Sequence, residues 1–156
     1  MKYWLLFFSV FIAAAALGTT SPQGTDIAKL APVEVVWLSE RDGQVFLKTD
    51  TGDYGAGQDM QTALENMKAT ASGTVFLDTA DYLIVEQGCE DLLDQTYTFL
   101  RPSCMICMAE RIPDLESVTE YLAAHEPELT LREYRVDKGE IPELVEQEGR
   151  FAWNVQ

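Results

Sequence analysis

The sequence predicts an α+β fold in which helices pack on a mixed β-sheet. Short β-rich runs alternate along the chain with segments whose apolar residues recur every three or four positions, a pattern typical of interleaved strands and helices. The pair Asp42-Gly43 separates two of the β-rich runs and predicts a hairpin. The length of 156 residues, with 47% hydrophobic and 24% charged, suits a single globular domain and excludes a disordered chain.

The N-terminus predicts an export leader. Lys2 supplies a minimal positive charge before an apolar run at 4–17. That run fits the roughly 7–15 residues of a signal-peptide core better than the roughly 20 of a membrane span, with an uncleaved N-terminal anchor helix as the alternative. The chain is therefore divided into a signal peptide or anchor at 1–18, a linker at 19–31 and a single α+β domain at 32–156. Either way we expect the domain outside the cytoplasm, secreted or anchored on the outer face of the cytoplasmic membrane.

The first half of the domain predicts a hairpin, a loop and a helix. β-Rich runs at 33–38 and 45–49 flank the Asp-Gly turn, since glycine accepts a positive φ at little cost. Residues 51–57 are rich in glycine and predict a loop. A helix capped by Asp59 follows, because one helical face is formed by Met60, Ala63, Leu64 and Met67.

The second half continues the alternation. Prolines mark several of its boundaries, because the residue before a proline disfavours helix and a proline suits a first helical turn. We expect strands at 74–77 and 82–85, or one strand bent around Thr79-Ala80, and further strands at 103–109 and 129–136. We expect helices at 90–100, between Pro113 and Pro127, and from Pro142.

The charge excludes several kinds of partner. Lys and Arg total 11 against 26 Asp and Glu, a net charge of -15 at pH 7. Such a chain repels phosphate backbones and anionic lipids, so we expect no nucleic acid, and membrane contact only through an uncleaved N-terminal helix. The chain has neither the glycine spacing of a phosphate loop nor a G-x-S-x-G motif, and its single histidine, His125, has no evident nucleophile partner. We therefore expect neither an enzyme nor a bound cofactor.

An acidic loop is the candidate contact surface. Asp50, Asp53 and Asp59 lie in and around the Gly-rich loop, together with Tyr54. Counted from Asp50, an EF-hand loop would need calcium ligands where Gly52 and Tyr54 stand, so the calcium spacing fails and a solvated acidic loop is expected. Because loops on a rigid scaffold commonly carry binding, we expect this loop and the strand edges near it to contact a partner protein.

The cysteines offer a second hypothesis. Cys104 and Cys107 form a C-x-x-C pair, which invites a thiol-redox or thiol-metal function, and Cys89 leaves an odd count. The pair lies in a predicted strand, where three residues span about 10 Å and the two side chains point to opposite faces. That separation exceeds the roughly 7 Å a disulfide tolerates, so buried structural thiols are the favoured interpretation. No metal site is expected, because zinc needs about four converging ligands.

The middle of the chain also carries a set of short motifs in a recognisable order. They are Gly55-Ala56-Gly57 with Ala63-Leu64, the β segment 75–85, the helix from Leu92 to Arg101-Pro102, and the strand 104–109. In this order, residues 33–110 resemble the first domain of the Ger(x)C family, the C subunits of spore germinant receptors. Family members are lipoproteins, whereas this leader has no lipid-acceptor cysteine.

The resemblance implies an exported, receptor-like domain of a spore or envelope complex that works by protein–protein contact. It implies integral-membrane receptor subunits as partners. It carries over no functional residue.

Overall fold

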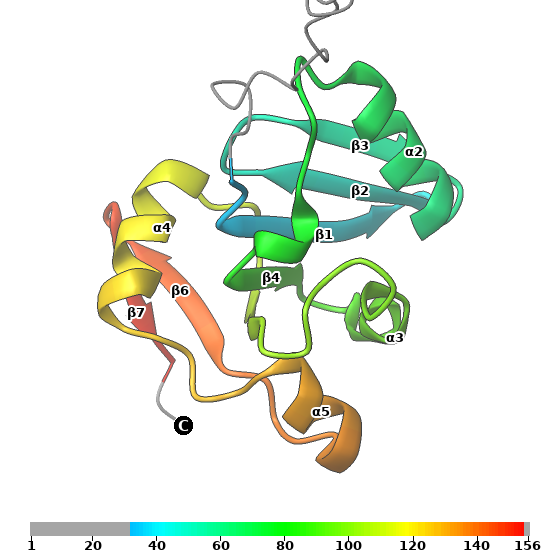
Figure 1. Cartoon of the computed structure of the whole chain (residues 1–156). Helices are drawn as coiled ribbons and strands as arrows, with labels where there is room; N and C mark the ends of the chain where they lie inside the picture. The colour runs from blue at the N-terminus through cyan, green and yellow to red at the C-terminus, as the bar shows by residue number, and fades with distance from the viewer. Residues whose placement is uncertain (1–31, 155–156) are drawn as a thin grey trace, which may run out of the picture.

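The computed structural model describes residues 32–154, which form one sheet with helices on both of its faces (Figure 1). The α+β class and the mixed sheet are thereby confirmed. The predicted leader at 1–18 and the linker at 19–31 lie outside the described residues. Among the helices of the described part, none is long and apolar enough to cross a membrane.

The sheet has seven strands in the order β3-β2-β1-β4-β5-β6-β7. In chain order they are β1 (Val35–Arg41), β2 (Gln44–Thr49), β3 (Tyr54–Gly57), β4 (Tyr82–Glu86), β5 (Met105–Ala109), β6 (Glu143–Gln147) and β7 (Arg150–Trp153). The neighbours β1, β4, β5 and β6 run parallel. Antiparallel strands extend this centre, β2 and β3 on one side and β7 on the other.

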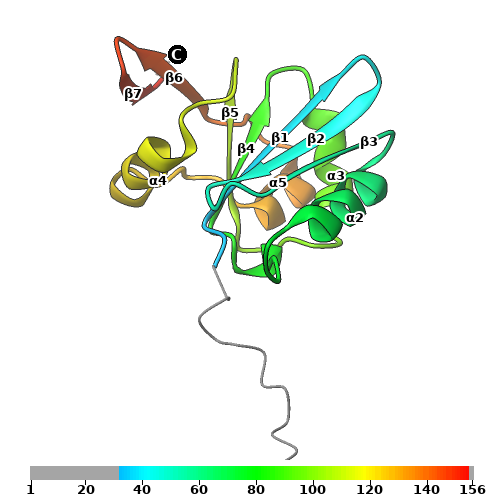
Figure 2. The same cartoon turned by 90° about the horizontal axis from the view of Figure 1, so that it is seen from above.

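The helices divide unequally between the two faces, as Figure 2 shows. Three lie on one face: α2 (Met60–Thr70), the short α3 (Leu93–Thr96) and α5 (Leu131–Asp137). Only α4 (Leu115–Ala124) lies on the other. We call these the three-helix face and the α4 face. One helix cannot cover seven strands, and this inequality decides which side chains stay accessible.

Strand alternation builds a separate core on each face, because successive side chains point to opposite sides of a sheet. In β1, Val36 and Leu38 belong to the core under the three helices, whereas Val35 and Trp37 belong to the core under α4. The predicted hairpin is confirmed: Asp42-Gly43 joins Arg41 to its cross-strand partner Gln44, with φ of 54° and 72° at the two turn residues.

The prediction of a loop at 51–57 is wrong in its second half, because Tyr54–Gly57 form β3. Its glycines serve close packing, because a Cβ at Gly55 would overlap the carbonyl oxygen of Ala63, and one at Gly57 would overlap the backbone of the same helical turn. Helix α2 itself matches the prediction, with its four apolar residues buried and Asp59 as its N-cap.

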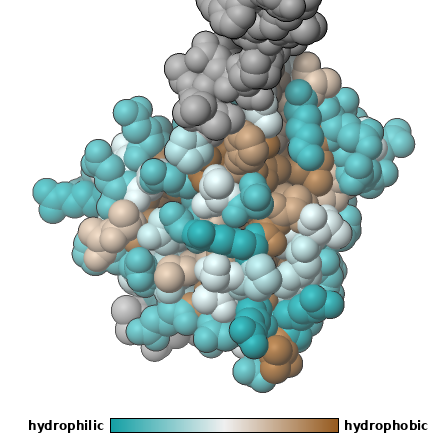
Figure 3. All heavy atoms as spheres, in the orientation of Figure 1, coloured by the Kyte–Doolittle hydropathy of each residue, from teal (hydrophilic) through white to brown (hydrophobic). Residues whose placement is uncertain are grey.

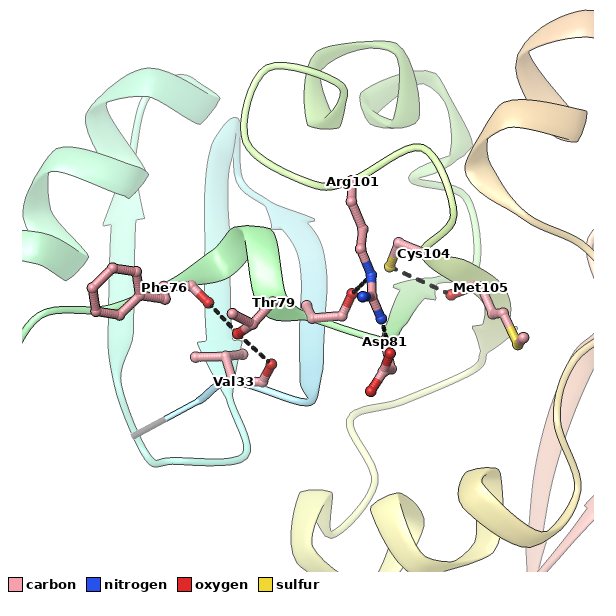
Figure 4. Close-up of polar contacts among 8 residues, drawn as sticks. Val33, Phe76, Thr79, Asp81, Arg101, Cys104 and Met105 are labelled. Carbon is pink, nitrogen blue, oxygen red and sulfur yellow. Dashed lines mark hydrogen bonds and ion pairs between the residues drawn. The ribbon is translucent and has the colours of Figure 1, made fainter. Parts of the chain in front are cut away.

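Two predictions before β5 are also wrong. Residues 74–77 are not a strand, since Phe76 makes only one bridge, to Pro32, and Leu77–Thr79 form a 3-10 turn. The Thr79 hydroxyl holds that turn by donating to the carbonyl oxygen of Phe76 at 2.7 Å (Figure 4). Figure 3 shows apolar residues gathered on the surface over this segment, which links α2 to β4. The helix expected at 90–100 is shorter, a 3-10 turn followed by α3.

The largest differences between the predicted elements and the structure lie near the C-terminus. The strand expected at 129–136 is helix α5, because Thr130 and Glu133 form a reciprocal capping box that starts a helix. The helix expected from Pro142 is strand β6, where Leu144 fills the α4 core beside β5. Strand β7 was not anticipated. The turn before it, Glu148-Gly149, has positive φ at both residues and makes the tight hairpin that pairs β7 with β6.

Candidate functional site

The carboxylates of the predicted contact loop are engaged within the chain. Asp50 accepts backbone N–H groups of Glu34 and Val35 at 3.2 and 3.3 Å, which ties the loop to the start of β1. Asp53 accepts the Thr51 hydroxyl at 2.9 Å. Both carboxylates are half-buried, and their hydrogen bonds hold the loop in place within the chain.

Asp59, the remaining carboxylate of that loop, caps α2. Its side chain accepts the backbone N–H of Thr62 at 2.7 Å, and this hydrogen bond lowers the pKa of Asp59. None of the residues 32–154 form a group of three or more side chains suited to hold a metal ion. The three aspartates therefore act separately: Asp50 and Asp59 accept backbone N–H groups, and Asp53 accepts the Thr51 hydroxyl.

Tyr54 is the aromatic residue of the predicted contact loop, and its side chain is exposed. Half of its surface is exposed, and its ring stacks on that of Phe46 with centroids 6.2 Å apart. Its cross-strand partner is Lys48, which in turn lies opposite Trp37. Because cross-strand partners share a face, Trp37, Lys48 and Tyr54 form a row across three strands on the α4 face.

A hollow of about 200 Å³ lies along this row. It is lined mainly by apolar and aromatic side chains of the strands and by the loop after β5, and we call it the aromatic groove: Trp37, Ser39, Arg41, Phe46, Lys48, Tyr54 and Ile112. No residue of α4 contributes to its lining. Tyr54 and Ile112 are two of the three large apolar or aromatic side chains that the described part exposes, so an exposed aromatic surface is concentrated here.

The aromatic groove carries positive charge in an acidic molecule. Arg41 pairs with Glu86 at 2.7 Å on one side of it. Lys48 is exposed and has no carboxylate within ion-pair distance in the described part of the chain. Hydrogen bonds from Ser117 lower the pKa of Asp114 most, and the Lys48 ammonium lowers it further from a distance. Although the net charge of -15 repels acidic ligands at long range, the Lys48 ammonium, unpaired within residues 32–154, favours a ligand carboxylate at this point of the groove.

The thiols of Cys104 and Cys107 lie on opposite faces of the sheet, as the strand spacing predicts. Cys104 belongs to the core of the three-helix face and Cys107 to the core under α4. Both are fully buried, and Cys89 is 8% exposed; none of the three forms a disulfide. Burial raises the pKa of Cys104 to about 12 and that of Cys107 even further above its ordinary value.

Arg101 lies next to Cys104 but is engaged elsewhere (Figure 4). Its Nε donates to the carbonyl oxygen of Ala80 at 3.1 Å, and its guanidinium pairs with Asp81. The Cys104 thiol points to the carbonyl oxygen of Met105, 3.7 Å away. A reactive thiolate needs a cation or helix N-terminus directed at it and some access to solvent. This thiol is enclosed, and its neighbouring cation is already paired.

A larger hollow, of about 520 Å³, lies where the α5–β6 connection meets the carboxyl ends of β4 and β5. Several of its polar side chains are paired within the protein. Lys138 donates to Asp94 at 2.8 Å, and the Asn154 amide donates to Glu143 at 2.6 Å. We therefore regard the smaller aromatic groove as the better candidate, because Lys48 and Tyr54 are exposed on it side by side, next to the half-buried Phe46.

Comparison with known proteins gives no match, since no protein family, no curated protein and no solved structure matches this chain. The resemblance to the Ger(x)C family stays a prediction. The evidence for a site is thus the geometry of the chain itself.

Proposed function

We propose that this chain is an extracytoplasmic, non-enzymatic domain that binds another protein through the aromatic groove. The observation that carries the proposal is one hollow at the margin of the α4 core, where the exposed Tyr54 and Ile112 and the half-buried Phe46 lie beside the buried Trp37. Aromatic residues surrounded by polar ones are typical of the energetic centres of protein interfaces.

The partner's chemistry follows from the groove. An apolar or aromatic side chain of the partner fits between Trp37, Phe46 and Tyr54, and a neighbouring carboxylate of the partner reaches Lys48. The apolar leader at 4–17 supports export, and the resemblance implies integral-membrane receptor subunits as the class of partner. We therefore propose an acidic, extracytoplasmic segment of such a subunit as the occupant of the groove.

Photo-crosslinking tests the proposal. A photoreactive phenylalanine analogue replaces Tyr54 in the full chain, expressed in its source organism, and membranes are irradiated before solubilisation. The control places the same analogue at Val136, which is 74% exposed on α5 and remote from the groove. We expect a crosslink from position 54, and none from position 136, to an integral-membrane protein at a segment containing Asp or Glu.

A second variant checks that the crosslink reports groove binding. Phe46→Ala removes the ring that stacks on position 54, so we expect the crosslink yield to fall at least tenfold while the fold is retained. No crosslink from position 54, or equal crosslinks from positions 54 and 136, would exclude the groove as the binding surface.

The thiol alternative receives no support from the geometry. Two thiols on opposite faces of a strand cannot close a disulfide without moving the backbone, and both pKa values are raised by burial. A dithiol redox centre needs a lowered pKa and exposure of at least one thiol. The protein-binding function is therefore the one that the arrangement favours.

A further inference from the structure

The two edges of the sheet differ in how their backbone is satisfied. At the β3 edge, the outward carbonyl oxygens are capped by side chains of α2. The Asn66 amide donates to the carbonyl oxygen of Ala56 at 2.7 Å, and the Thr70 hydroxyl donates to that of Tyr54 at 3.3 Å. An incoming strand would have to displace these contacts, so this edge is protected.

The β7 edge has no such protection among the described residues. The backbone N–H of Asn154 donates to Glu143 across the β6–β7 ladder, and the register pairs Ala152 with Val145. Bonded and non-bonded pairs alternate in an antiparallel ladder, so Phe151 and Trp153 direct their N–H and C=O groups away from β6. Within residues 32–154 no hydrogen bond is made to these groups, and β7 forms the outer margin of the sheet in Figure 2.

The β7 edge is also held in place. The rings of Phe151 and Trp153 pack on Tyr121 of α4, with centroids 5.8 and 6.0 Å apart. The tight turn Glu148-Gly149 fixes the register of the hairpin. The strand therefore presents its free donors and acceptors in a fixed, extended geometry, which lowers the entropy that a pairing strand must lose.

We propose that β7 pairs antiparallel with β7 of a second copy of this chain, about a two-fold axis at Ala152. In that register Phe151 of one copy lies opposite Trp153 of the other. This register pairs every outward N–H and C=O of Phe151 and Trp153 in both strands, and it joins two seven-stranded sheets into one.

Charge and side chains favour a second copy at this edge. Although the chain carries a net charge of -15, residues 150–154 contain no acidic residue and include Arg150. Two β7 strands can therefore approach without direct carboxylate repulsion. The same register places Phe151 of each copy beside Trp153 of the other on one face, and such aromatic cross-strand pairs stabilise antiparallel strands.

Cysteine crosslinking of the full chain tests the pairing. At the axis the two Ala152 residues form a non-hydrogen-bonded pair with Cα atoms about 4.5 Å apart, within the range that a disulfide accepts. Two copper(II)–phenanthroline complexes oxidise two Ala152→Cys thiols to one disulfide; each copper accepts one electron and becomes copper(I), while both protons pass to solvent. The native thiols are buried, so they are protected from the reagent in the folded chain.

The matched control is Asn154→Cys. Both positions are exposed, Ala152 on β7 and Asn154 directly after it, but in the proposed register two copies of residue 154 are about 14 Å apart, given about 3.4 Å per residue. We expect disulfide dimers to form at least tenfold faster from Ala152→Cys than from Asn154→Cys. Equal rates from the two variants, or no dimer from either, would overturn the proposal.

A third variant separates this inference from the proposed function. Phe46→Ala in the aromatic groove should leave the crosslinking rate of Ala152→Cys unchanged, because the groove and the β7 edge share no residue. A rate that falls with the groove substitution would mean that the copies meet through the groove and not through β7.

Discussion

The α4 face of the sheet has two halves that differ in what covers them. Under α4, strands β4 and β5 contribute Ile84 and Cys107, both fully buried against Val118 and Leu122. Over β2 and β3 no helix of the described residues lies, and the same face carries Phe46, Lys48 and Tyr54, the last with half of its surface exposed. One alternating strand pattern therefore yields core or binding surface according to helix coverage.

The largest contrast between the halves is in stability. Ile84→Ala, in the covered half, removes a fully buried side chain and leaves a cavity under α4. We expect the free energy of unfolding to fall by about 2–5 kcal/mol. Tyr54→Ala, in the open half, should lower it by only about 0.5–1.5 kcal/mol, because it removes the stacking of a half-exposed ring on Phe46. Urea unfolding followed by circular dichroism measures both. Similar losses for the two variants would mean that the two halves of the α4 face do not differ in burial.

The opposite side of β3 provides the next test. Gly55 faces α2, not the aromatic groove, and a Cβ there would meet the backbone oxygen of Ala63 and the Met67 side chain. We expect Gly55→Ala to destabilise the chain by about 1–3 kcal/mol through overpacking. Ala56→Ser, one residue on and half-buried on the groove side, is the control. Stability unchanged in Gly55→Ala would show that α2 does not pack closely on β3.

Much of the fold could be predicted from local signals. The Asp42-Gly43 turn, the helical spacing of α2 and the Asp59 cap each depend on residues close together in sequence, and all three are found. The segment 129–136 carries two conflicting local signals. Its alternation of apolar and polar residues favours a strand, but the Thr130–Glu133 capping box favours a helix start and decides the structure of α5.

The aromatic groove was harder to predict, and only its Tyr54 was anticipated. Its other residues come from β1, β2 and a distant loop, and their meeting depends on strand register. A signal was present in the strands: Phe46 and Lys48 alternate with Val45 and Leu47, so one face of β2 is aliphatic and the other is not. No local pattern reveals that α4 does not extend over this half of the α4 face.

Burial of Cys107 under α4 also makes the free energy of unfolding depend on pH. The Cys107 thiol has a raised pKa in the folded chain because burial disfavours its thiolate, against about 9.0 unfolded. Above pH 9 the unfolded chain therefore loses a proton that the folded chain keeps, and stability falls as pH rises. At pH 10 we expect a loss of about 1.4 kcal/mol from this thiol relative to pH 7.

Cys107→Val identifies that contribution. The substitution keeps an apolar side chain of similar size under α4 and removes the titrating group, so the fall in unfolding free energy between pH 7 and 10 should shrink by about 1.4 kcal/mol. The native thiols should also resist iodoacetamide at pH 8 until the chain is unfolded in urea. An unchanged pH dependence, or rapid labelling of the folded protein, would place Cys107 in contact with solvent.

The smallest effect on stability is expected from Lys48, which should nevertheless change binding. Lys48→Glu alters an exposed side chain, so unfolding should shift by less than about 0.5 kcal/mol. If an acidic partner occupies the aromatic groove, its association rate should fall several-fold at low salt, and the difference from wild type should shrink as salt rises. Lys68→Glu, the same charge change on exposed α2 of the three-helix face, is the control. Equal losses from the two variants would mean that net charge, and not the uncovered half of the α4 face, attracts the partner.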